Sequence, residues 1–133
     1  MTATPAGPSA TAQLARALAG LDQALDAPRR AGIPLGNWRW VVRQRMTALR
    51  DALAQDSGTS DDGWLAARGG VAFRERNALL ARLGTLSGKV LETPDVEATR
   101  LELKRLLGDV THHLQRLRDL AYDEVAMELG GSE

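Results

Sequence analysis

A single long amphipathic pattern near the C-terminus constrains the fold of this 133-residue sequence more than any other feature. Within Thr93–Leu129, apolar residues recur every seven positions, and a second set follows at the complementary spacing. The first set is Val96, Leu103, Val110 and Leu117, and the second is Leu107, Leu114 and Ala121. This spacing predicts one helix over Pro94–Glu128, roughly 52 Å long at the usual rise. Thr93 is the expected N-cap, and Gly130-Gly131 is expected to end the pattern.

Three shorter amphipathic segments precede this helix, and we expect helices over 10–26, 38–55 and 71–92. Their apolar stripes are Leu14, Leu18, Leu21 and Leu25 in the first, Trp38, Val42, Met46, Leu49 and Leu53 in the second, and Phe73, Leu80, Leu83, Val90 and Leu91 in the third. Asn37 is the expected N-cap of the second helix because its side chain can accept a backbone hydrogen bond there.

Two segments between these helices carry turn-forming residues. Residues 27–36 contain two prolines and two glycines, and residues 56–70 are rich in Ser, Gly and Asp. Both are predicted to be irregular connections, the second with a short apolar anchor at Trp64-Leu65.

Leucine and alanine dominate the composition, whereas aromatic residues make up 4%. This balance favours helix over strand. We therefore expect an all-α protein, an antiparallel four-helix bundle with a long C-terminal helix. It forms a single domain over 10–129, with flexible tails at 1–9 and 130–133.

Composition also excludes several classes of function. The absence of cysteine excludes disulfides, zinc-thiolate sites and thiol chemistry. No segment predicts a signal peptide or a membrane span, so we expect a cytoplasmic protein. The 17 basic and 17 acidic residues cancel, and bulk charge therefore indicates no nucleic-acid partner. No nucleophile motif or phosphate-binding glycine loop is present, so we expect neither an enzyme nor a cofactor.

The two histidines, His112 and His113, do not predict a metal site. Adjacent residues on a helix point about 100° apart, so both cannot bind one metal ion. Asp109 and His112 have the carboxylate-to-histidine spacing of helical di-iron proteins, but those sites need a second such unit. We therefore expect the histidines to lie on a solvated charged face. A bundle that binds a metal or carries out redox chemistry is kept as a less favoured alternative function.

An arginine-rich face on the second predicted helix is the best candidate for binding a partner. Arg39, Arg43 and Arg50 lie beside Trp40, which points away from the apolar stripe. Such a face can anchor a protein partner through tryptophan and arginine. It can also bind a nucleic acid by stacking bases on the ring and neutralising phosphates with the arginines. A third alternative is that the preceding loop covers Trp40 and leaves only a solvated basic face.

Charged residues interrupt the apolar stripes at four positions: Arg45, Arg76, Glu124 and Glu128. Since an unpaired buried charge costs several kcal/mol, we expect Arg45 to pair with Glu124 or Glu128, within one chain or across a dimer. Alternatively, the last two turns fray into solvent. The last helix exceeds the third by about 20 Å, so the segment after Leu117 needs cover from the 57–70 loop, the first two helices or a second copy.

The run from His112 to Glu133, with Asn37-Trp38-Arg39-Trp40 upstream, resembles a group of small actinobacterial proteins with no assigned activity. The resemblance implies an actinobacterial source and an all-helical fold, and it carries over no site. From the residues themselves we expect a small helical adaptor or regulator that forms a homodimer through the overhanging C-terminal half of the last helix. Its partner contact is expected on Arg39, Trp40, Arg43 and Arg50. The alternative is a nucleic-acid or phospholigand binder that uses the same residues.

Overall fold

The computed structural model describes residues 10–31, 34–55 and 63–131, with side chains over 10–27, 34–55 and 70–123. The described residues form four helices and no strand. The helices are α1 (Ala10–Ala31), α2 (Leu35–Gln55), α3 (Gly63–Glu92) and α4 (Val96–Gly131). The predicted tail at 1–9 and the last two residues of the predicted tail at 130–133 lie outside the described residues.

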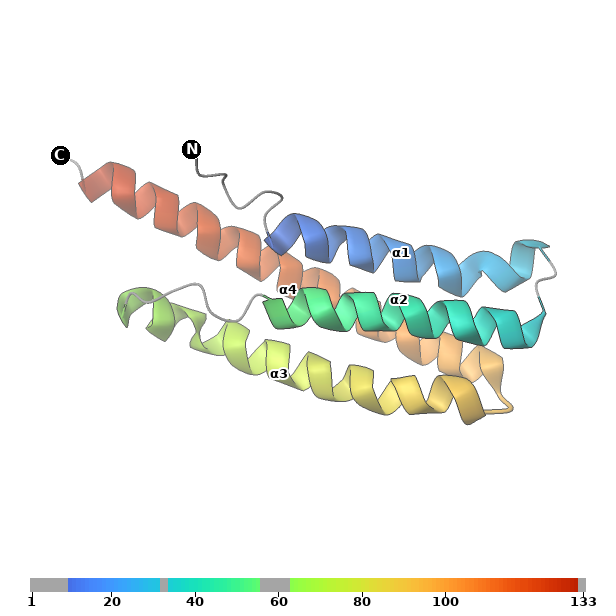
Figure 1. Ribbon diagram of the computed structural model, residues 1–133. Coiled ribbons are helices and arrows are strands. Elements are labelled where there is room, and N and C mark those ends of the chain that lie inside the picture. Colours follow the sequence, from blue (N-terminus) through green and yellow to red (C-terminus); the bar gives the residue numbers. More distant parts are fainter. Residues whose placement is uncertain (1–9, 32–33, 56–62, 132–133) are drawn as a thin grey trace, which may run out of the picture.

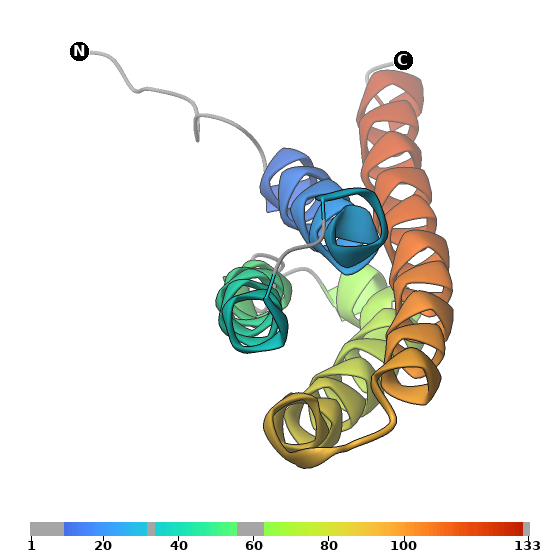
Figure 2. The ribbon, with the colours of Figure 1, turned by 90° about the vertical axis from the view of Figure 1, so that its right-hand side faces the viewer.

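The helices form the predicted antiparallel four-helix bundle. Successive helices run in opposite directions around a ring, so that α1 packs on α2 and α4, and α3 packs on the same two helices (Figures 1 and 2). In the described part of the chain, α2 and α4 make no contact because they occupy opposite corners.

Helices α1 and α2 are longer than predicted, and they shorten the 27–36 connection. Helix α1 continues through Pro28 for one more turn, although proline within a helix removes one backbone donor and its ring crowds the carbonyl four residues earlier. Helix α2 begins at Leu35, and the carbonyl of Pro34 accepts a hydrogen bond from the N–H of Trp38 at 3.0 Å. Asn37 therefore lies in the first turn, and the prediction that it caps the helix was wrong.

The predicted loop over 56–70 is also mostly wrong, because α3 begins at Gly63, eight residues before the predicted start. Trp64-Leu65 belongs to this helix and not to a loop, although the side chains there lie outside the described residues. Gly69-Gly70 does not stop α3, since a glycine within a helix costs only about 1 kcal/mol and contacts elsewhere along the helix can offset that cost.

Asp95, rather than Thr93, caps the long helix. The Oδ1 atom of Asp95 accepts a hydrogen bond from the N–H of Ala98 at 3.0 Å. The hydroxyl of Thr93 accepts the N–H of Asp95 at 3.1 Å and so holds the capping residue. Pro94 precedes the helix, which begins at Val96 and continues through Gly130 to Gly131. The predicted boundaries are thus displaced by two or three residues at both ends.

The core contains most of the predicted stripes. Buried apolar residues in α1, α2 and α4 include Leu14, Leu21, Leu25, Trp38, Val42, Met46, Leu49, Leu53, Leu103, Val110 and Leu114. The stripe of α3 differs from the prediction and consists of Ala72, Arg76, Leu79, Leu83, Leu86 and Val90. Phe73 and Leu91 were predicted in this stripe, but each exposes about half of its surface, at 55% and 46%.

Polar contacts between helices fix their register. They show that α3 and α4 extend farther than α1 and α2 at one end of the bundle. Lys104 of α4 pairs with Asp22 of α1, so counting along the antiparallel pair places Ala10 opposite about residue 116. Glu75 of α3 accepts a hydrogen bond from Arg116 at the same level. Among the described residues, 63–74 of α3 and 117–131 of α4 continue beyond this level, and we call these two segments the projection.

Figure 1 shows α4 extending past the N-terminal end of α1, while the start of α3 diverges from it. Because α3 begins earlier than predicted, it extends past the ends of α1 and α2 on the same side as α4, although its start spreads away from that helix (Figure 1). The overhang is therefore two helices wide, and α1 and α2 do not cover it.

Candidate interaction surfaces

Arg39, one of the predicted partner-binding residues, has a structural role in the fold. Its two terminal nitrogens donate hydrogen bonds to the carbonyls of Leu91 at 2.9 Å and Thr93 at 2.7 Å. The Leu91 carbonyl belongs to the last turn of α3, where the last four carbonyls of a helix lack intrahelical partners, and the Thr93 carbonyl belongs to the turn that follows. Arg39 thus ties α2 to the turn between α3 and α4, and its terminal guanidinium nitrogens are already bonded within the chain.

The other predicted partner-binding residues form one exposed stripe. Trp40, Arg43, Thr47 and Arg50 are spaced three, four and three residues apart, which places them on one face of α2. The Trp40 side chain is 61% exposed, so the loop before α2 does not cover it. We call Trp40, Arg43 and Arg50 the Trp40 surface.

The arginines of the Trp40 surface differ in their surroundings. Arg43 is half-buried, and its Nε atom is shielded from water without a hydrogen-bond partner. Arg50 is exposed and lies 3.7 Å from the carboxylate of Asp51, the next residue along the helix. Thr47 turns its hydroxyl back to the carbonyl of Arg43 at 3.1 Å. The stripe therefore combines one large apolar ring with two cations.

Trp38, two residues from Trp40, faces the opposite way. It is 2% exposed, and its indole N–H donates to the carbonyl of Ala24 in α1 at 3.0 Å. This hydrogen bond satisfies the polar atom of a buried tryptophan and joins the first two helices. The two neighbouring tryptophans thus have separate roles, one in the core and one on the surface.

Arg45 does not lie in the buried stripe as the periodicity predicted. It is exposed and extends across α1, with its Cδ atom 3.7 Å from the position that a Cβ at Gly20 would occupy. The long aliphatic stem lets the charged end reach water beside the smaller residue. The side chains of Glu124 and Glu128 lie outside the described residues, so the ion pair of Arg45 with either acid stays a prediction.

The two histidines have different environments. His112 is exposed, whereas His113 is 1% exposed and belongs to the core face of α4. Nδ1 of His113 lies 2.8 Å from a carboxylate oxygen of Glu75, which also accepts Nε–H of Arg116 at 3.1 Å. Nε2 of His113 is buried and has no hydrogen-bond partner.

The Glu75 carboxylate is held in its charged form by these partners. Burial acts to raise the pKa of Glu75, but hydrogen bonds from His113 and Arg116, with the attraction of the same two groups, outweigh it and lower that pKa. Sequence reasoning missed Glu75 because it stands between Arg74 and Arg76 in an apparently solvated run. Its contacts depend on the register of α3 against α4.

A second polar cluster joins α1 to α4 and was also missed. Arg100 contacts Asp26 and Glu97, each at 3.0 Å, and Lys104 contacts Asp22 at 2.6 Å and Asp26 at 3.2 Å. Burial acts to lower the pKa of Lys104, but the hydrogen bonds that its ammonium group donates to the two aspartates raise it overall. The sequence signal for this cluster was the i, i+4 spacing of two acids, Asp22 and Asp26, and of two bases, Arg100 and Lys104. These charges hold helices together and leave no reactive group free.

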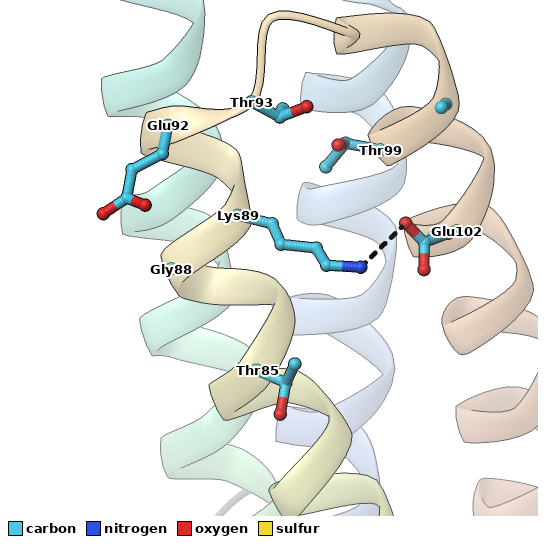
Figure 3. Close-up of a pocket in the computed structure, with 8 residues that line it drawn as sticks. Thr85, Gly88, Lys89, Glu92, Thr93, Thr99 and Glu102 are labelled. Carbon is cyan, nitrogen blue, oxygen red and sulfur yellow. Dashed lines mark ion pairs between the residues drawn. The ribbon is translucent and has the colours of Figure 1, made fainter.

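A groove of about 490 Å³ lies between the end of α3 and the start of α4. Its lining consists of Thr85, Gly88, Lys89, Glu92, Thr93, Ala98, Thr99 and Glu102. Figure 3 shows the Lys89 side chain crossing it toward Glu102, with which it pairs at 3.5 Å. Lys89, the cation that lines the groove, is thus already paired, and no histidine lines the groove. We therefore assign no catalytic or binding role to the groove.

Among the residues that the structure describes, no group of three His, Asp or Glu side chains could hold a metal ion. No described helix is long and apolar enough to cross a membrane. The chain matches no family model, no curated protein and no solved structure. The fold and its surfaces thus define the class of protein as an antiparallel four-helix bundle, and the resemblance to actinobacterial proteins stays a prediction.

Proposed function

We propose that this protein is a cytoplasmic, non-enzymatic protein-interaction module that acts as an adaptor or regulator and works as a homodimer. The observation that carries this proposal is the exposed Trp40 with Arg43 and Arg50 on the same face of α2. An exposed tryptophan flanked by arginines is the composition that dominates binding energy in protein interfaces. The partner surface should therefore offer an apolar pocket with carboxylates around it.

The contacts of the arginines favour a protein partner over a nucleic acid. Arg39 donates its terminal nitrogens to backbone carbonyls, and Arg50 already has Asp51 as a neighbour. This leaves few free cations for phosphates, in a chain whose net charge is zero. A nucleic-acid surface usually presents a cluster of uncompensated cations.

Photo-crosslinking tests the proposal. A photoreactive phenylalanine analogue replaces Trp40 in cells of the source organism, and in a control chain it replaces Leu101, an apolar residue that is 46% exposed on α4. We expect position 40, and not position 101, to crosslink to a defined protein. Arg43→Glu with Arg50→Glu should abolish that crosslink, because both cations would then repel the carboxylates of the partner.

Two results would contradict the proposal. One is a crosslinking pattern that is the same at positions 40 and 101 or is unaffected by the arginine substitutions. The other is salt-sensitive binding of a random single-stranded oligonucleotide to the purified protein, lost in Trp40→Ala, since phosphate contacts weaken steeply as salt rises. That second result would establish the nucleic-acid alternative.

A further inference from the structure

Among the side chains that the structure describes, Arg76 is a buried charge without a carboxylate partner. It occupies a core position of α3 and is 8% exposed. Its Nε atom is buried and has no hydrogen-bond partner, and a terminal nitrogen lies 3.5 Å from the side-chain oxygen of Asn77. The guanidinium also stacks 4.7 Å from the centre of the Phe73 ring. These contacts leave its charge uncompensated, which is costly for a buried arginine.

Arg76 stands where the projection leaves the bundle. By the register of Glu75 with Arg116, it lies opposite about residue 115 of α4. Beyond it, Phe73 is 55% exposed because α2 ends at Gln55, and Tyr122 is 74% exposed because α1 begins at Ala10. A layer of two helices has no second layer against which to bury its apolar face.

The sequence places carboxylates at the far end of this projection. Glu124 continues the seven-residue spacing of Val110 and Leu117, and Glu128 follows four residues later in a helix that runs to Gly131. Both positions therefore belong to the stripe that forms the core farther down α4. Glu124 is roughly 13 Å farther along the helix axis than Arg76, so neither acid lies opposite Arg76 in its own chain.

An antiparallel second copy brings these charges together. The projection is about 20 Å long, and when two projections overlap side by side, the far end of one reaches the start of the other. The Glu128 position of each copy then lies about one helical turn from the level of Arg76 in its partner, and the Glu124 position lies one turn farther away. The overlap also places α3 segments that carry Arg68, Arg74 and Arg76 against α4 segments with Asp119, Asp123, Glu124 and Glu128.

We propose that two copies pair through their projections into an intermolecular four-helix bundle, in which Glu124 or Glu128 of each copy neutralises the buried Arg76 of the other. This deepens the homodimer part of the proposed function. The pairing is isologous, so the same contact forms twice across a twofold axis and the assembly closes as a dimer. This single pairing covers the projection of each copy and also supplies a carboxylate to Arg76.

A charge-swap experiment tests the pairing by light scattering over a concentration series. The wild type should have twice the monomer mass of 14.3 kDa. Arg76→Glu alone and the double variant Glu124→Arg, Glu128→Arg alone should each be monomeric, because like charges meet at both contacts. An equal mixture of the two variant proteins should recover the dimer, since both contacts then join opposite charges.

Matched controls separate this contact from general charge effects. Arg82→Glu makes the same charge change at an exposed position of α3 outside the projection, and Arg45→Glu tests the pairing first expected from the sequence. Both should remain dimeric. Trp40→Ala should also remain dimeric, so the mass measurement is independent of the partner surface on α2.

Three results would overturn the pairing: a monomeric wild type at every concentration, a mixture that stays monomeric, or an Arg82→Glu or Arg45→Glu variant as disruptive as Arg76→Glu. Far-UV circular dichroism checks that each variant is folded. If Arg76→Glu fails to fold, the variant with all three charges reversed decides instead, and it should be folded and dimeric. A triple variant that stays monomeric or unfolded would then contradict the proposal.

Discussion

At the scale of single residues, the charged side chains of this bundle divide into those that hold helices together and those that face outward. Glu75 joins α3 to His113 and Arg116 of α4, and Arg39 joins α2 to the last carbonyls of α3. Each bond joins residues that are at least 38 positions apart in the sequence. Trp40 has no such bond and exposes its ring.

Glu75 should make stability depend on acid pH. Its pKa is lower in the folded chain than in the unfolded chain, so its contribution is fully present above the unfolded value of 4.5 and is lost as pH falls through the folded value. We expect Glu75→Gln to lower the free energy of unfolding by about 1–2 kcal/mol at pH 7, by weakening the bonds with His113 and Arg116. Urea denaturation at pH 7 and pH 3 should show the difference from wild type shrinking at pH 3.

The matched control is Asp109→Asn, which removes an exposed carboxylate that pairs with Arg82 on the same two helices. It should change the free energy of unfolding by less than about 1 kcal/mol. A difference between Glu75→Gln and wild type that is equal at the two pH values would contradict the role given to Glu75.

Residue roles could be predicted where they follow from spacing along one helix. Leu14, Trp38 and Val110 are buried as the periodicity predicts, and Trp40 faces away from the core stripe. Roles that depend on the relative position of two helices could not be found in this way. Arg39 reaches carbonyls that are more than fifty residues away in the chain, and Phe73 is exposed because a different helix ends early.

At the scale of elements, the helices exist where they were predicted, and their ends differ. Apolar periodicity extends over many turns and tolerates local exceptions, whereas an end depends on one or two capping bonds. Taken by themselves, Pro28 and Gly69-Gly70 predict helix ends. Helices α1 and α3 run through them, with packing contacts along the rest of each helix.

The cap of α4 gives a direct test at this scale. Asp95→Ala removes the oxygen that accepts the N–H of Ala98 and should lower the free energy of unfolding by about 1 kcal/mol. Thr93→Ser keeps the hydroxyl that accepts the N–H of Asp95 and should have a much smaller effect. Thermal and urea denaturation of both variants provide the measurement. A larger loss in Thr93→Ser than in Asp95→Ala would restore Thr93 as the capping residue.

At the scale of the whole molecule, four helices of unequal reach produce two structural regions. The level of Arg76 and His113 separates a closed bundle from a projection that is two helices wide. The closed bundle presents Trp40 on one face of α2, and the projection is the surface that we propose for a second copy. The sequence predicts that α4 extends beyond the other helices. That α3 extends beside it follows from the start of α3 at Gly63, which the sequence did not predict.

Hydrogen–deuterium exchange at two protein concentrations tests the central claim, that a second copy covers the projection. We predict that amides in 63–74 and 117–131 exchange more slowly at high concentration, because association protects them by mass action. Amides in the closed bundle, such as those of 79–90 and 103–114, should change less. Exchange in the projection that is the same at both concentrations, across a range in which the mass doubles, would contradict the account.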